Sequence, residues 1–126
     1  MPDDDKLREQ LASIGARYLK RTLGDLQRIT ELASDAQAGS PTALKDLEQA
    51  AHKIHGSGAM FGFHEVSDHA GTIEQIAGHL ADGDGPVHLH ALGAEELRGR
   101  LATAVQRLAD VTRQAAANLG IEPNAS

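Results

Sequence analysis

The feature that most limits the folds open to this chain is the spacing of its apolar residues by three and four positions. Residues spaced in this way share one face of an α-helix, so each such run predicts an amphipathic helix. The runs predict four helices, joined by short connections, at about residues 4–37, 41–60, 64–80 and 94–119. This order favours an all-α fold, an antiparallel up-and-down four-helix bundle.

The stripe of apolar residues changes register within the first predicted helix. It begins with Leu7, Leu11, Ile14 and Tyr18, and it continues, offset, with Thr22, Leu26, Ile29, Ala33 and Ala36. Gly15 lies at the change, so we expect either two helices, at about 4–14 and 16–37, or one helix that bends there. A charged run indicates a solvated face rather than a binding patch. It comprises Arg17, Lys20, Arg21, Asp25 and Arg28.

The other three helices each carry one stripe that is expected to form the core. The members are Leu44, Leu47, Ala51, Ile54, Gly58 and Phe61, then Val66, Ala70, Ile73, Ala77 and Leu80, and finally Leu97, Leu101, Ala104, Leu108, Val111, Ala115 and Leu119. Turn-forming residues separate the helices: Ser40 and Pro41, Gly62, and residues 82–86. We expect Val87 and Leu89 to pack under the bundle and residues 121–126 to fray.

The composition agrees with a helical core and excludes several classes of protein. One Tyr and two Phe are the only aromatic residues, so the core must consist of Leu, Ile, Val and Ala. The absence of Cys excludes a disulfide framework and a thiolate metal site. A net charge of −6 argues against nucleic-acid binding. The length of 126 residues indicates a single domain, 1–126, and its self-contained pattern of stripes favours a monomer.

No part of the sequence indicates a membrane segment. No apolar run approaches the roughly 18 to 20 residues that cross a bilayer. The acidic start, Asp3, Asp4 and Asp5, differs from the basic start of a signal peptide. We therefore expect a cytoplasmic protein that binds no membrane.

The most distinctive stretch is AAHKIHGSGAMFGF at residues 50–63, where an imidazole stands among very small residues. His52 follows the core position Ala51 by about 100° around the helix, so its ring is expected at the solvent edge. Each Gly in a helix interior costs roughly 0.5–1 kcal/mol relative to Ala. One explanation for a glycine at residue 56 is that it gives another protein access to the ring of His52. The alternative is that residue 56 is tightly packed or that the helix frays there. Gly58, on the core stripe, is expected to admit a facing helix.

Glu74 follows the core residue Ile73 by one position, just as His52 follows the core residue Ala51. If the second and third helices are antiparallel, the two residues should meet, because they lie ten positions before and twelve after Gly62. A carboxylate that accepts a hydrogen bond from one ring nitrogen leaves the other nitrogen as a nucleophile. The sequence therefore predicts an oriented and reactive imidazole.

Residues 52–63 resemble the histidine phosphotransfer (HPt) signature, and together with Glu74 they are similar to the phosphoacceptor domain of chemotaxis histidine kinases. The resemblance covers residues 50–74, and it implies that His52 is the phosphoacceptor and that Glu74 orients its ring. We expect a partner to contact Lys53, Gly56, Ser57 and Ala59. We expect structural roles for Gly58, Phe61, Gly62 and Phe63.

This resemblance implies a phosphorelay carrier without an ATP site of its own. His52 would accept a phosphoryl group from a histidine or hybrid kinase, or from a receiver aspartate, and pass it to the receiver domain of a response regulator. The chain would need no cofactor, because the partner would supply Mg²⁺. A complete shuttle and a piece of a larger chemotaxis-type kinase both fit the sequence.

His55 departs from the family pattern, which usually has Lys three residues after the phosphoacceptor. Lysine is a permanent cation at neutral pH, whereas most imidazoles are neutral there. We therefore expect phosphorylated His52 to be less stabilised than in relatives with Lys, and more sensitive to pH between about 6 and 8. Lys53 points about 100° away from His52 and is a poor substitute.

Two other functions fit the same residues. One is an interaction module in which His52 is never phosphorylated. The other is a metal-binding bundle, although no HExxH or Glu-x-x-His pattern supports it. Its ligands would be His52 and His55 with His69 or Glu74, or a loose cluster of His79, His88 and His90.

Overall fold

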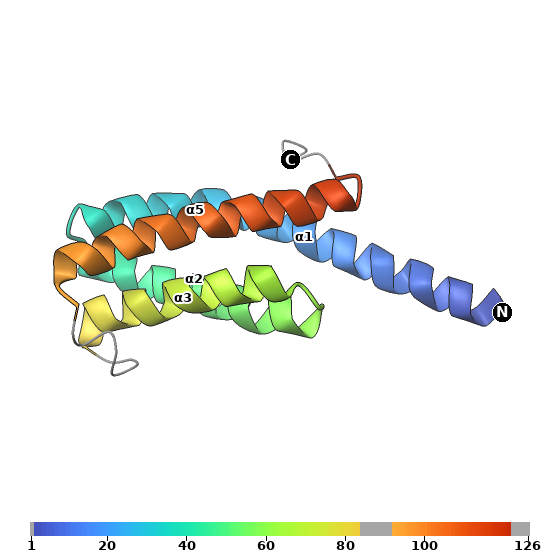
Figure 1. Cartoon of the computed structure of the whole chain (residues 1–126), viewed down its shortest axis with the longest axis horizontal. Helices are drawn as coiled ribbons and strands as arrows, with labels where there is room; N and C mark the ends of the chain where they lie inside the picture. Colours follow the sequence, from blue (N-terminus) through green and yellow to red (C-terminus); the bar gives the residue numbers. More distant parts are fainter. Residues whose placement is uncertain (1, 84–91, 122–126) are drawn as a thin grey trace.

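The computed structural model describes residues 2–83 and 92–121, and its helices form a bundle (Figure 1). Successive helices run in opposite directions, so the expected all-α antiparallel up-and-down four-helix bundle is confirmed. The predicted helix bounds differ from the observed ones by at most two residues. The helices are α1 (Pro2–Gln37), α2 (Pro41–Met60), α3 (His64–Asp82) and α5 (Ala94–Asn118).

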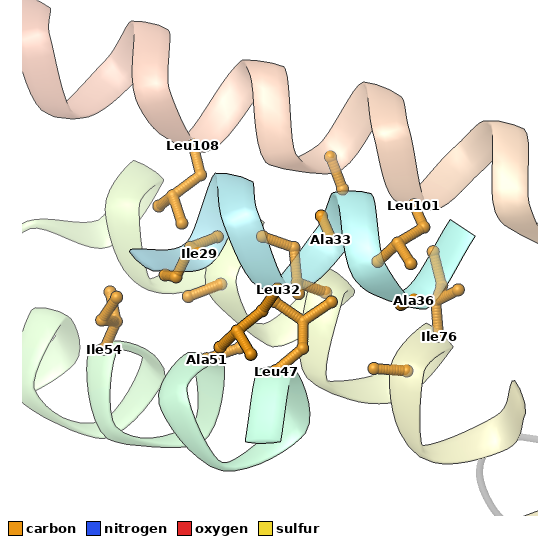
Figure 2. Packing of buried hydrophobic residues seen from close by; sticks show 14 of the residues in the cluster. Ile29, Leu32, Ala33, Ala36, Leu47, Ala51, Ile54, Ile76, Leu101 and Leu108 are labelled. Atoms are coloured by element: carbon orange, nitrogen blue, oxygen red, sulfur yellow. The ribbon is translucent and has the colours of Figure 1, made fainter. Parts of the chain in front are cut away.

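The core lies between the four helices and consists of small and branched apolar side chains (Figure 2). Leu101 and Leu108 project from α5 toward α1 and α2, where Ile29 and Leu47 are completely buried. Burying a side chain of this size stabilises a fold by roughly 1.5–3 kcal/mol. The second stripe of α1 is buried as predicted, from Thr22 to Ala36.

The turns before α2 and α3 follow from their sequences. Ser40 caps α2 by accepting a hydrogen bond from the N–H of Ala43 at 3.2 Å, and Pro41 begins the helix, as predicted. Gly62 has φ = +83°, a conformation that side chains with a Cβ rarely adopt, so it lets the chain reverse between α2 and α3. The predicted packing of Val87 and Leu89 lies outside the described residues.

α1 is one continuous helix, so of the two alternatives expected at Gly15 the break into two helices is wrong. Gly15 is buried, and a Cβ there would lie 3.4 Å from the ring of Phe63, so this glycine makes room for an aromatic side chain. The first turns of α1 slope away beyond the end of the bundle (Figure 1). As a result, the exposed fractions of Leu7 and Leu11 are 53% and 59%.

The core stripes of α2 and α5 end differently from the prediction. Phe61 is 40% exposed, because α2 ends at Met60 and the ring turns onto Tyr18, with 4.9 Å between the ring centroids. In the last part of α5 the buried face moves by one residue, from Val111 and Ala115 to Thr112 and Ala116. Leu119 is therefore exposed, whereas Ile121, which was expected to fray, is buried and donates to the carbonyl of Ala116 at 2.8 Å.

Candidate functional site

His52 stands on the solvent edge of α2, as predicted from its place beside Ala51. Ala51 is completely buried, whereas the side chain of His52 is 76% exposed. The ring is fixed by Glu74 of α3, whose carboxylate Oε2 lies 2.6 Å from Nδ1. The predicted meeting of these two residues across the α2–α3 turn is thus confirmed.

The short contact between His52 and Glu74 determines which ring nitrogen can react. An ionised carboxylate has no proton to donate, so in this pair Nδ1–H donates and Oε2 accepts. The lone pair of the neutral ring is then on Nε2. Glu74 is only 23% exposed, and its neighbour Ile73 is completely buried, so the packing of α3 holds the carboxylate in place.

His55 shares the same carboxylate from the other side. Its Nδ1 lies 3.6 Å from Oε1 of Glu74, which is too long for a hydrogen bond but close enough for an ion pair when the ring is protonated. The ring of His55 rests on Gly71 of α3, where a Cβ would lie 3.2 Å from its Cε1. The backbone carbonyl of His55 accepts a hydrogen bond from Ser67 Oγ at 2.7 Å.

Small residues let α2 and α3 approach each other closely along this face. A Cβ at Gly58 would lie 3.1 Å from the backbone N of Ser67, so Gly58 admits the facing helix as expected. Glu48 fills the space beside Gly78, where a Cβ would overlap its Oε2. We call Gly58, Gly71 and Gly78 the glycine seam.

The seam keeps the two helices in one antiparallel register. Glu48, His52 and His55 are separated by four and three residues along α2. Their counterparts on α3 are Gly78, Glu74 and Gly71, which are separated by the same steps in reverse. Each side chain of α2 therefore crosses to a definite residue of α3. Farther along, the ammonium of Lys45 lies 3.7 Å from the carboxylate of Asp82.

A hollow of about 350 Å³ lies beside the imidazole. It is lined by Glu48, Gln49, His52, Lys53 and Glu74. Its volume exceeds that of a phosphoryl group. Gly56 follows His52 by one helical turn along α2 and is exposed. A Cβ at Gly56 would meet nothing within 4 Å, so the alternative of tight packing at Gly56 is wrong.

The opposite side of α2 contacts α1 through Tyr18. The hydroxyl of Tyr18 donates to the carbonyl of Ile54 at 3.3 Å, and the ring stacks on Phe63 with 5.6 Å between centroids. Ser57 Oγ donates to the carbonyl of Lys53 at 2.7 Å and lies 3.2 Å from the Tyr18 hydroxyl. Ser57 thus supports the packing of α1 on α2, and its contact with a partner stays a prediction.

Lys53 and Ala59, the other predicted partner contacts, are both exposed. The charge of Lys53 also acts on α1. Partial burial raises the pKa of Asp25, and the positive charges of Arg21 and Lys53 oppose this rise. Lys53 therefore lies between the hollow beside His52 and a carboxylate of α1.

The metal alternative has no support in the described part of the chain. Within residues 2–83 and 92–121, no three His, Asp or Glu side chains are arranged to hold a metal ion. His69 instead lines a larger hollow of about 830 Å³ between α3 and α5. His88 and His90 lie outside the described residues.

Sequence reasoning missed the residues of α3 that receive side chains from α2. Gly71 and Gly78 do not belong to the predicted apolar stripe of residues 64–80, so the spacing of apolar residues predicted no function for them. The signal was nevertheless available, because they lie three residues before and four after Glu74. Once His52 is paired with Glu74, the same antiparallel register assigns His55 to Gly71 and Glu48 to Gly78.

The structure is thus a helical bundle with an exposed histidine that a carboxylate holds. The comparison with protein families identifies the class of this bundle, because residues 7–111 match the Hpt domain. The match covers most of the chain, which therefore belongs to the Hpt domain family. No curated protein and no solved structure matches the chain significantly.

Membership of this family gives the chain a histidine phosphotransfer role in a phosphorelay. Proteins of the family carry phosphoryl groups without an ATP site of their own and interact with kinases and receiver domains. In the part of the chain that the structure describes, no helix has both the length and the apolar character needed to span a bilayer.

Proposed function

We propose that Nε2 of His52 is the atom that carries the phosphoryl group. The observation that supports this most strongly is the contact of 2.6 Å between Nδ1 and Glu74, because it leaves Nε2 as the free nucleophile on a ring that is 76% exposed. Family membership alone would fit any exposed histidine of the chain. The short hydrogen bond to Glu74 distinguishes His52 from His55, whose Nδ1 lies 3.6 Å from the same carboxylate.

The reaction at His52 is a displacement at phosphorus. Nε2 attacks the phosphorus of a receiver acyl phosphate, an N–P bond forms, and the P–O bond to the aspartate breaks. The ring keeps its proton on Nδ1, so positive charge develops on the imidazole while it is hydrogen-bonded to Glu74. In the reverse direction a receiver aspartate attacks the phosphorus, the N–P bond breaks, and the ring becomes neutral again. A kinase would deliver the group from ATP to the same nitrogen.

The partner completes the site. We infer that it docks over His52 where Gly56 has no side chain, and that Lys53 and Ala59 lie within its footprint, since all three residues are exposed. In this scheme Mg²⁺ belongs to the receiver or kinase and neutralises the charge that develops on the phosphoryl oxygens. Action as a monomer in the cytoplasm, and as one domain over residues 1–126, stays a prediction.

Labelled phosphoryl transfer tests the role of His52. The protein is incubated with a labelled phospho-receiver, or with a histidine kinase and labelled ATP. We expect label that survives alkali, is lost in acid, and is absent from His52→Gln. His55→Gln is the matched control, because it removes the neighbouring imidazole and should keep the label. Label that persists in His52→Gln would place the phosphoryl group on another residue and overturn the proposal for His52. Wild-type protein that never becomes labelled would favour the interaction module.

A further inference from the structure

Glu48 places a second carboxylate at the phosphoacceptor site. It lies one helical turn before His52 on α2, and both residues line the hollow of about 350 Å³. The side chain is half-buried, since its Oε2 packs against Gly78 of α3. Any side chain at residue 78 would overlap that oxygen, so Gly78 provides the space that the carboxylate of Glu48 occupies.

The charges around the hollow are unbalanced. Glu48 and Glu74 contribute two carboxylates, and Lys53 contributes the one permanent cation among the five lining residues. Lys53 also opposes the rise in the pKa of Asp25 of α1, so a third carboxylate lies near the same cation. Lys45, the cation nearest to Glu48 in sequence toward the start of α2, lies 3.7 Å from Asp82. A phosphoryl group on His52 would enter this surplus of negative charge.

We propose that Glu48, held in place by Gly78, destabilises the phosphorylated state of His52 and so displaces the transfer equilibrium toward the receiver aspartate. This inference rests on the proposed function of His52. A phosphoryl group adds a charge of roughly −1.5 to −2. Glu74 also repels the phosphoryl group, but its hydrogen bond to Nδ1 stabilises the positive charge of the phosphorylated imidazole and offsets part of that repulsion. Glu48 has no such contact with the ring, so its effect on the phosphoryl group is repulsive.

The size of the effect follows from Coulomb's law. Residues one turn apart on a helix have Cβ atoms about 5–6 Å apart, and the charged ends lie somewhat farther apart. At such distances, in a surface hollow that is close to water in dielectric behaviour, the repulsion corresponds to about a three- to tenfold change in an equilibrium constant. It should also weaken as salt is added, because the Debye length falls to about 3 Å at 1 M.

The test measures the equilibrium constant for phosphoryl exchange between His52 and a receiver domain. For Glu48→Gln, which keeps the shape and removes the charge, we expect a shift of about three- to tenfold toward phospho-His52 at low salt. The shift should shrink to less than twofold at about 1 M salt. Glu31→Gln is the matched control, because it removes the same charge from the exposed face of α1 and should change the constant by less than twofold.

Gly78→Ala tests the placement independently. Its Cβ would displace the carboxylate of Glu48 from its place, so Gly78→Ala should change the equilibrium constant when Glu48 is present. In a chain that already carries Glu48→Gln, the same change should have no further effect. Circular dichroism of each variant verifies that the bundle is intact.

Two results would overturn the inference. One is an exchange constant for Glu48→Gln within twofold of the wild type at low salt, with His52 normally phosphorylated; this leaves the proposed function standing. The other is a shift that does not respond to salt, which would indicate a structural effect of Glu48. Absence of phosphoryl label on wild-type His52 would instead overturn the proposed function together with this inference.

Discussion

The core of the bundle and the glycine seam are both contacts between helices, but they consist of different types of residue. In the core, Ile29, Leu47 and Leu108 are completely buried and fill the space between helices. Along the seam, Gly58, Gly71 and Gly78 replace bulky side chains, and polar side chains cross between α2 and α3. The difference teaches that the core stabilises the fold, while the seam positions charged and titratable groups.

This division has an energetic consequence. A glycine in a helix interior is roughly 0.5–1 kcal/mol less favourable than alanine, so each glycine of the seam lowers helix stability. The apolar burial in the core, at roughly 1.5–3 kcal/mol for each large side chain, is sufficient to offset it. Substitutions in the two regions should therefore differ in size and, at some positions, in sign.

The largest effect is expected from removing core volume. Leu47→Ala should lower the free energy of unfolding by about 2–5 kcal/mol, because its side chain is completely buried at the centre of the bundle. Leu11→Ala is the matched control: this leucine is 59% exposed on the projecting part of α1, so the change should be within about 0.5 kcal/mol. Urea unfolding followed by circular dichroism measures both. A comparable loss for Leu11→Ala would show that this stripe packs against something in solution.

Effects of intermediate size on the free energy of unfolding are expected at two glycines of α2, and the two effects should be opposite in sign. Gly58→Ala should destabilise the protein by about 1–3 kcal/mol, because its Cβ would press on the backbone of Ser67, which cannot rotate away. Gly56→Ala should stabilise it by about 0.5–1 kcal/mol, because its Cβ would meet nothing within 4 Å. The denaturation midpoints of both variants, compared with that of the wild type, test this prediction. Two changes of the same sign would contradict the distinction between the seam and the exposed edge.

The smallest effect is expected from the charge at residue 55. An ordinary imidazole loses its proton between about pH 6 and 8, whereas lysine remains charged throughout. The lifetime of phospho-His52 should therefore be similar in His55→Lys and the wild type near pH 6, and longer in His55→Lys by about two- to fivefold near pH 8.

Phosphohistidine decay measured across this range tests the charge at residue 55. His69→Lys, in the separate hollow between α3 and α5, makes the same substitution and should leave the lifetime unchanged. Lifetimes of His55→Lys and the wild type that agree at every pH would exclude an electrostatic role for residue 55.

The sequence was sufficient for the fold and for the central pair of the site. Apolar spacing placed the helices, and the distances of His52 and Glu74 from Gly62 predicted their contact, because an antiparallel turn leaves one register available. The exposure of Leu7 and Leu11 could not be predicted, since a stripe of apolar residues does not reveal whether another helix covers it. Gly71 and Gly78 were missed for a related reason: what matters at these positions is a side chain that crosses from another helix.

The unequal lengths of the helices have a further consequence. α1 has 36 residues and α2 has 20, so at about 1.5 Å per residue α1 continues for several turns past the end of its neighbour. Isolated helices shorter than about 12–15 residues are marginal in water, so the projecting turns keep their helical form only by continuing from the packed part of α1. Unwinding of these projecting turns should stop near Tyr18, which is buried against its neighbours, and should leave the imidazole and its carboxylate undisturbed.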